Sequence, residues 1–268
     1  MPPKQNIKIL YEDVDIIVCI KPAGIASQGG KGFAQDMTDL LKLHIQKATG
    51  AKGEPYLGIV HRLDQPVGGV MVYAKKAASA ASLSAQAASE EMRKRYYAVL
   101  EQCPPETEGT LKDYLLRDGR TNISAVVPEA RRREKDVKLA ELSYRIIKEA
   151  AQVSEYATAQ GFTTTLSAIA PQSGMLDMQP DAQADSQRGA QKLYLAEISL
   201  KTGRHHQIRV QFSHAGCPLY GDRKYNPATE GRELALFSHY LEFTHPKTKK
   251  RMQFDEKPEH GIFAEFFA

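Results

Sequence analysis

Four residues at positions 61–64 place a histidine, an arginine and an aspartate at the end of an apolar run. They read His61-Arg62-Leu63-Asp64. A proline and a glycine pair follow, and a β-rich run then extends to Lys75. Because Pro66 cannot donate to a strand ladder and glycines accept unusual backbone angles, the pattern predicts strand, loop and strand, with the turn just after Asp64. An isolated Arg-x-Asp is better interpreted as a surface ion pair, so the rest of the chain must decide.

A second polar segment occupies positions 202–218. It begins Thr202-Gly203-Arg204-His205-His206-Gln207-Ile208-Arg209. The spacing of its apolar residues predicts a short helix beginning near Arg204, and Gly216 suits a left-handed stop. His205 and Arg209 would then share one helix face, four residues apart. The segment therefore predicts a basic, histidine-rich helix start far along the chain from Asp64.

Five histidines in the C-terminal part could suggest a metal hydrolase. They are His205, His206, His214, His239 and His245. Adjacent histidines on a helix point about 100° apart, and His206 and His214 would lie roughly 12 Å apart along its axis, too far to share one ion. We therefore expect no metal.

The strands and helices that must position these segments follow from periodicity and breakers. Two short strands at 7–11 and 15–20 predict a hairpin around an acidic turn. A helix should follow, capped near Asp36 or Thr38 and ended by Gly50. The other expected elements are a helix at 77–92, a turn at 117–120, and strands at 96–100, 140–147, 193–200 and 234–243.

Length and composition allow a sizeable core, since the chain has 268 residues and 42% hydrophobic content. Its net charge of +4 is uneven, because residues 149–190 hold five acids and one base, a net of −4 that leaves +8 elsewhere. Basic clusters at 93–95, 131–133 and 247–251 could contact a polyanion such as nucleic acid. We interpret 149–190 as a flexible or lightly structured insertion, in which 162–166 could form a small strand.

Cysteine usage and hydropathy bear on the compartment. The three cysteines form no Cys-x-x-Cys pair, so neither a disulfide framework nor a cysteine-rich zinc site is indicated, and buried positions are expected. No window is long and apolar enough to cross a bilayer, and the first residues lack the apolar region of a secretory signal. We expect a cytoplasmic protein without a membrane partner.

Five motifs in series resemble those of the RluA-like family of RNA pseudouridine synthases. They are Lys21-Pro22-Ala23-Gly24, His61-Arg62-Leu63-Asp64, Lys94-Arg95-Tyr96, Thr202-Gly203-Arg204-x-His206-Gln207-Ile208-Arg209 and Gly216-Cys217-Pro218-Leu219-Tyr220-Gly221-Asp222. Their order and spacing match from about residue 7 to residue 247. The resemblance implies an isomerase without a cofactor that converts uridine in structured rRNA or tRNA to pseudouridine.

The resemblance also implies the architecture. It predicts an α+β fold with a largely antiparallel mixed sheet, split by a central RNA-binding cleft and flanked by helices. Residues 1–268 would form one catalytic domain without an N-terminal S4 RNA-binding module. The protein is expected to act on RNA as a monomer.

Catalytic roles in this family would fall on Asp64, Tyr96 and Arg209. Asp64 would act, as nucleophile or as base, on the sugar carbon left when the N1–C1′ bond breaks. Tyr96 would stack on the uracil and help remove the C5 proton. Arg209 would pair with Asp64 and favour the charged form of its carboxylate. Alone, each residue has a plain structural interpretation, and only the complete set favours catalysis.

Substrate binding would involve residues around these three. Arg62 would fill the space left by the flipped uridine, whose extrusion costs a few kcal/mol. The other expected substrate-binding residues are His61, Lys21, Arg204, His206 and Gln207. Lys21 could support the cleft wall or bind a phosphate, and a solvated lysine is nearly as well supported.

Residues 65–69 depart from the family pattern. They read Gln65-Pro66-Val67-Gly68-Gly69, where many members carry a basic residue followed by Thr-Ser-Gly. Because Asp64 itself is retained, the departure leaves the reaction in place and the target uridine open. The alternative function is a non-catalytic RNA-binding protein of the same fold that acts in ribosome assembly.

Overall fold

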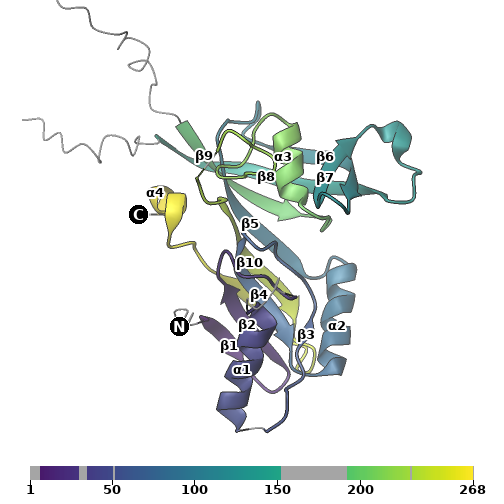
Figure 1. Cartoon of the computed structure of the whole chain (residues 1–268), viewed down its shortest axis with the longest axis vertical. Helices are drawn as coiled ribbons and strands as arrows, with labels where there is room; N and C mark the ends of the chain where they lie inside the picture. The colour runs from purple at the N-terminus through teal and green to yellow at the C-terminus, as the bar shows by residue number, and fades with distance from the viewer. Residues whose placement is uncertain (1–6, 30–34, 51, 152–191, 230, 268) are drawn as a thin grey trace, which may run out of the picture.

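The computed structural model of the chain describes residues 7–29, 35–50, 52–151, 192–229 and 231–267 (Figure 1). The strands are β1 (Ile9–Glu12), β2 (Ile16–Lys21), β3 (Gly58–Ile59), β4 (Gly68–Ala74), β5 (Arg93–Leu100), β6 (Glu108–Asp118), β7 (Ile123–Val127), β8 (Val137–Ala151), β9 (Lys192–Leu200), β10 (Leu236–Thr244) and β11 (Arg251–Asp255). The helices are α1 (Met37–Thr49), α2 (Ala77–Ala88), α3 (Gln207–His214) and α4 (Ala264–Phe267), with short 3-10 turns η1 (Glu129–Arg131) and η3 (Gly261–Phe263).

All strands of the described residues join one sheet in the order β1-β2-β4-β10-β5-β9-β8-β6-β7, with β3 beside β4 and β11 beside β10. Only β4 and β10 pair in parallel, and the other pairs are antiparallel. The expected α+β class with a largely antiparallel mixed sheet is therefore confirmed. Figure 1 shows α1 and α2 beside the β2-β4-β10 part of the sheet, and α3 beside the part formed by β6, β7 and β8.

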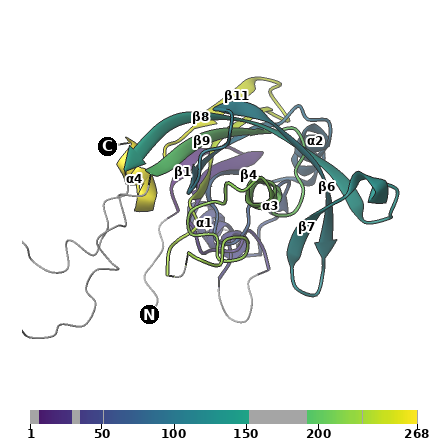
Figure 2. The same cartoon turned by 90° about the horizontal axis from the view of Figure 1, so that it is seen from above.

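Different helices cover the two faces of the sheet. On one face, Leu41 of α1 and Phe212 of α3 join a core with Met71 of β4. On the opposite face, Leu83 of α2 packs against Val70. Successive side chains of a strand point to opposite faces, which is why neighbouring residues of β4 enter different cores. Figure 2 shows α1 and α3 on the same side of the curved sheet, and the first residues of α3 line the site described below.

Helix α1 has the boundaries that its sequence predicts. Asp36 is the N-cap, and its side chain accepts hydrogen bonds from the backbone of Thr38 and Asp39. Asp39 bonds back to the Asp36 backbone, which completes a capping box. Gly50 ends the helix in the left-handed conformation, with φ 67°.

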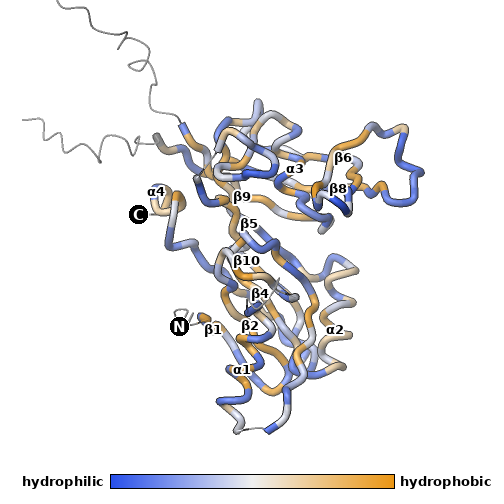
Figure 3. Tube along the Cα trace, viewed as in Figure 1, coloured by the Kyte–Doolittle hydropathy of each residue, from blue (hydrophilic) through white to orange (hydrophobic). Residues whose placement is uncertain are grey.

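The central strands and the connection between β7 and β8 differ in hydropathy. Figure 3 shows hydrophobic residues in the central strands and mostly hydrophilic residues in the connection between β7 and β8. That connection carries the exposed cluster Arg131-Arg132-Arg133. Among the described residues, no helix is long and apolar enough to cross a membrane.

Two helix boundaries differ from the sequence predictions. Helix α2 ends at Ala88, before the expected end at Met92, because Glu90 adopts φ 63° and Met92 turns into the core. Helix α3 begins at Gln207 because His206 is left-handed, so His205 precedes the helix and cannot share a helix face with Arg209.

Other predictions are confirmed only in part. Residues 149–151 belong to β8, and the rest of the proposed insertion, with the suggested strand at 162–166, lies outside the described residues. Strand β11 was not among the expected elements. Cys103 is exposed, contrary to expectation, whereas Cys19 and Cys217 are buried.

Candidate active site

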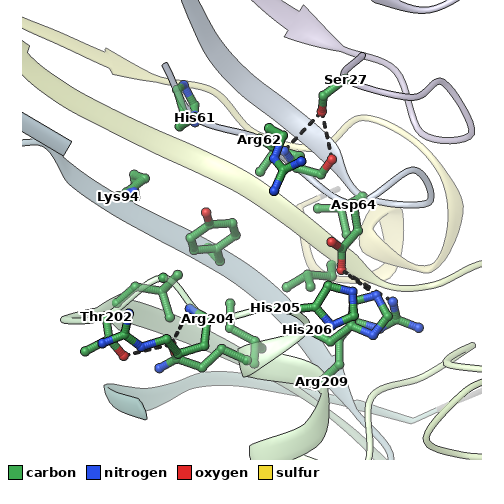
Figure 4. Close-up of a pocket in the computed structure, with 18 of the residues that line it drawn as sticks. Ser27, His61, Arg62, Asp64, Lys94, Thr202, Arg204, His205, His206 and Arg209 are labelled. Atoms are coloured by element: carbon green, nitrogen blue, oxygen red, sulfur yellow. Dashed lines mark hydrogen bonds and ion pairs between the residues drawn. The ribbon is translucent and has the colours of Figure 1, made fainter. Parts of the chain in front are cut away.

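A polar cavity of about 860 Å³ opens between the loop after β3, strand β5, the β6–β7 hairpin and the start of α3 (Figure 4). Eight of the nine predicted site residues line it, and these are His61, Arg62, Asp64, Tyr96, Arg204, His206, Gln207 and Arg209. The ninth, Lys21, is not among the lining residues. The fold therefore brings together the two polar segments that the sequence separates.

A tight turn presents Asp64 at the cavity. The Val67 amide donates to the Asp64 carbonyl over 3.0 Å, so the chain turns where the sequence predicts. Ser27 Oγ accepts from the Leu63 amide at 3.1 Å and donates to the Leu63 carbonyl at 2.7 Å. On the other side of the aspartate, the Gly24 amide donates to the Gln65 carbonyl at 2.9 Å. The loop that carries Asp64 is thus held on both sides.

Lys21 supports this loop from behind. Its ammonium group donates to three backbone carbonyls, those of Pro22 at 3.0 Å, Ile25 at 2.6 Å and Gln65 at 3.0 Å. The residue is fully buried, and burial lowers the pKa of Lys21 to about 7 although the charge of Asp64 opposes the shift. The interpretation as a solvated lysine is wrong. A phosphate contact is also unavailable in this structure, because all three donors are used inside the protein.

We expect Lys21→Met to lower kcat by loosening the Asp64 loop and to lower the free energy of unfolding by about 1–3 kcal/mol. The reason is that three carbonyls lose their donor in a largely buried site. Thermal unfolding and activity assays would measure both effects. Lys192→Met is the matched control, because Lys192 lies at the surface in an exposed pair with Glu149. Equal stability of the two variants would contradict the supporting role.

The Asp64 carboxylate receives its contacts on one oxygen. Arg209 Nη1 lies 3.4 Å and His206 Nε2 lies 3.5 Å from Asp64 Oδ2. Asp64 Oδ1 has no hydrogen-bond partner among the described residues, and 30% of the side chain is exposed. One carboxylate oxygen is therefore free to meet a substrate in the cavity.

Arg209 makes its shortest bonds to Asp222. Nε and Nη2 reach the two carboxylate oxygens of Asp222 at 2.8 and 2.6 Å, a bidentate pair. Burial disfavours the charge on Arg209, but the hydrogen bonds and charge of Asp222 outweigh it and raise its pKa. Asp222 is a functional candidate that sequence reasoning missed, since it stood in a motif without a role. It keeps the guanidinium charged and aimed beside Asp64.

His206 enters the site as a neutral ring. Burial, and next the charge of Arg209, lower the pKa of His206 to about 3. The short distance to Asp64 is therefore a contact with an uncharged imidazole and not an ion pair. Its other nitrogen, Nδ1, lies 2.8 Å from the Tyr225 hydroxyl.

Tyr96 lies on β5 and is almost completely buried, with 7% of its surface exposed. Burial raises the pKa of Tyr96, and the charge of Asp64 adds to the shift. The hydroxyl therefore keeps its proton at neutral pH. The ring lines the cavity together with Asp64, in a position to contact a base that enters it.

His61 and Arg62 differ although they are neighbours. His61 Nε2 accepts from the Val72 amide at 3.1 Å, which ties the loop to β4, and burial lowers the pKa of His61 to about 3. Arg62 is exposed and forms no hydrogen bond or ion pair with the residues that the structure describes. Figure 4 shows the Arg62 side chain beside the Asp64 loop. His61 thus supports the loop, whereas Arg62 is free to contact substrate.

Arg204 and Gln207 shape the start of α3. Gln207 Oε1 accepts from the Thr202 hydroxyl at 2.8 Å and from the Arg204 amide at 3.0 Å. Arg204 Nε donates to the Leu139 carbonyl at 2.8 Å, although the residue is exposed. The Gln207 amide nitrogen is buried and has no partner among the described residues. It is a donor that the protein itself leaves unused.

The histidines do not gather around an ion. Within the described ranges, no three histidine, cysteine, aspartate or glutamate residues form a group that could hold a metal. His239 instead bonds Asp255 at 2.9 Å, and His245 bonds Asp13 at 2.9 Å.

Comparison with known proteins identifies a family. Residues 15–214 match the family described as RNA pseudouridylate synthase. The uncharacterized RNA pseudouridine synthase YlyB of Bacillus subtilis (strain 168) is 27% identical over 253 residues, which cover 93% of this chain and 68% of that protein. Ribosomal large subunit pseudouridine synthase C of Buchnera aphidicola subsp. Schizaphis graminum is 28% identical over 260 residues, which cover 93% of this chain and 67% of that protein.

A solved structure supports the fold. Human RNA Pseudouridylate Synthase Domain Containing 4 aligns with a TM-score of 0.67 at 20% identity, covering 96% of this chain and 90% of the human one. Since the family match spans most of the sequence, and includes the segments that hold Asp64, Tyr96 and Arg209, the chain belongs to the RNA pseudouridylate synthase family.

Proposed function

We propose that this chain is an isomerase that converts uridine in structured RNA to pseudouridine, with Asp64 acting on the ribose. The observation that supports the proposal is the Asp64 carboxylate, which lies in a polar cavity with Oδ1 unpaired among the described residues and Oδ2 beside Arg209 and His206. The cavity, at about 860 Å³, is large enough to take in a flipped nucleotide.

The reaction needs no redox cofactor, because uridine and pseudouridine are isomers and no net oxidation or reduction occurs. The N1–C1′ bond breaks, a C5–C1′ bond forms, C5 loses a proton and N1 gains one. Asp64 acts on the electron-poor sugar carbon, as nucleophile or as base. Arg209 is held in place by its bidentate pair with Asp222, and from there it orients the Asp64 carboxylate. Tyr96 supplies an aromatic face and a hydroxyl beside the base.

Cationic side chains around the cavity would hold the RNA. The exposed ones are Arg62, Arg117, Lys201 and Arg204. Basic side chains attract phosphates irrespective of sequence, so they fix the RNA and do not select the uridine. We assign Arg62 to the gap that the flipped uridine leaves in the base stack, because its guanidinium is exposed on the loop that carries Asp64.

Deleting the gene and mapping pseudouridine across all RNAs tests the proposal. We expect one or a few pseudouridines to disappear from rRNA or tRNA and to return when the wild-type chain is supplied. Unchanged maps would refute the catalytic function and leave the alternative of a non-catalytic RNA-binding protein. We extend the proposal to a monomer that acts in the cytoplasm, which size-exclusion chromatography and cell fractionation would test.

Tyr96→Phe should lower kcat by about 10²-fold or more, with little change in KM for the RNA. The ring that contacts the base remains, whereas the protonated hydroxyl, which would hydrogen-bond the uracil while the C5 proton leaves, is lost. Single-turnover assays with the RNA identified above would measure this. Tyr240→Phe is the matched control, because that buried hydroxyl donates to Glu242 away from the cavity. A higher KM at unchanged kcat would instead limit Tyr96 to binding.

A further inference from the structure

His206 has a backbone conformation that calls for an explanation. It lies in the left-handed region, with φ 53° and ψ 25°, directly before α3. Three other non-glycine residues of the described ranges have positive φ, namely Glu90, Asn122 and Lys249, and all three are exposed. His206 alone among these four is buried. A buried side chain held by an unfavourable backbone conformation at the edge of a site indicates a functional constraint.

A chain of polar contacts runs from β7 to Asp64 through this residue. The Ser124 amide donates to the Tyr225 hydroxyl oxygen at 2.9 Å. The same hydroxyl lies 2.8 Å from His206 Nδ1, and His206 Nε2 lies 3.5 Å from Asp64 Oδ2. The left-handed turn at His206 is what places both ring nitrogens between Tyr225 and Asp64.

The directions of these bonds follow from the donors available. Tyr225 keeps its proton at neutral pH, because burial raises its pKa. Its oxygen already accepts from Ser124, so its hydrogen is directed to the neighbouring acceptor, His206 Nδ1. A neutral imidazole has a single N–H group, which must then be on Nε2. Nε2 is the ring nitrogen that lies 3.5 Å from Asp64 Oδ2.

We propose that Tyr225 is a positioning residue that acts through His206, by fixing the ring in the Nε2–H form so that it donates to Asp64 Oδ2. The inference rests on the proposed function, since it concerns the residue assigned to the sugar. With His206 and Arg209 both directed at Oδ2, Oδ1 is left to face the ribose.

The same chain of contacts connects the site to the β6–β7 hairpin. Ser124 Oγ lies 2.9 Å from both His205 Nδ1 and the His205 carbonyl. Arg117 and Asn122 of the hairpin line the cavity where RNA would enter. RNA bound against the hairpin would therefore change the position of the start of α3 and, through His206, the position of the Asp64 carboxylate.

The tautomer of His206 tests the inference without any RNA. In protein labelled with ¹⁵N-histidine, we expect Nδ1 unprotonated and Nε2 protonated at neutral pH, with His206→Gln used to assign the signal. In Tyr225→Phe, which keeps the ring and loses the hydroxyl, the signal should shift toward a mixture of the two tautomers. A proton on Nδ1 in the wild type would overturn the proposal, whatever the activity of the enzyme.

Kinetics provide the second readout. We expect Tyr225→Phe to lower kcat by about tenfold with KM within twofold, as loss of one orienting hydrogen bond predicts. His206→Gln, whose amide can still donate to Asp64, should retain more activity than His206→Ala. Tyr240→Phe controls for loss of a buried hydroxyl. A kcat of Tyr225→Phe within twofold of wild type would overturn the inference. An inactive wild type would instead count against the proposed function and would leave the tautomer result valid.

Discussion

Asp64→Asn is expected to abolish pseudouridine formation, with kcat reduced by at least about 10³-fold, while stability and RNA affinity stay close to wild type. The amide has the shape of the carboxylate but neither its charge nor its nucleophilicity. The fold should tolerate the change because the side chain is partly exposed and Arg209 remains paired with Asp222. The loss should therefore appear in the chemical step alone.

Three measurements on purified protein separate chemistry from binding and folding. They are single-turnover conversion of the identified RNA, RNA binding at fixed salt, and thermal unfolding. Asp255→Asn is the matched control, since Asp255 lies on β11, outside the residues that line the cavity, and loses the same charge. Activity of Asp64→Asn above a tenth of wild type would contradict the assigned role, and so would a loss of activity explained by lost RNA binding.

Local signals made the Asp64 loop predictable. A proline and a glycine pair mark the end of the loop, and the turn after Asp64 forms there. At Gly69, φ is 130° and an added Cβ would overlap the Ser238 backbone of β10, so no other residue fits this close approach. The capping residues of α1 were equally local and equally informative. Where a boundary is decided by neighbouring residues, the sequence contains enough information to place it.

Side-chain contacts between segments far apart in the sequence were not predictable in the same way. Nothing in the spacing of Arg209 and Asp222 requires a bidentate pair, because the chain between them must first turn back over the end of α3. In the sequence, Lys21 resembles a surface lysine. Its burial depends on the loops around it, which bring three backbone carbonyls to its ammonium group. The start of α3 was placed too early, because the propensity of His206 does not reveal its contacts to Tyr225 and Asp64. In each case a contact between distant segments outweighed the local pattern.

Asp222→Ala should reduce both stability and activity, because it leaves the Arg209 guanidinium charged, buried and without its main partner. The side chains of Arg209 and Asp222 are only 5% and 1% exposed. Breaking a buried pair by removing one member costs about 3–5 kcal/mol, far more than an exposed pair contributes. Asp222 Oδ1 also accepts from the Lys224 amide at 3.1 Å, so the turn after Asp222 loses a bond as well.

Urea denaturation and single-turnover assays would measure these losses, and a double variant separates them. Arg131→Ala is the matched control, since Arg131 forms a bidentate pair with Glu134 at the surface, with 43% and 49% of the side chains exposed, and its loss should cost far less stability than loss of the buried pair. In Arg209→Met with Asp222→Ala, neither member of the buried pair is left as an unpaired charge, so much of the stability should return while activity does not. If Asp222→Ala were as stable as Arg131→Ala, the buried pair would not hold Arg209. If the double variant were active, Arg209 would not be needed to aim Asp64.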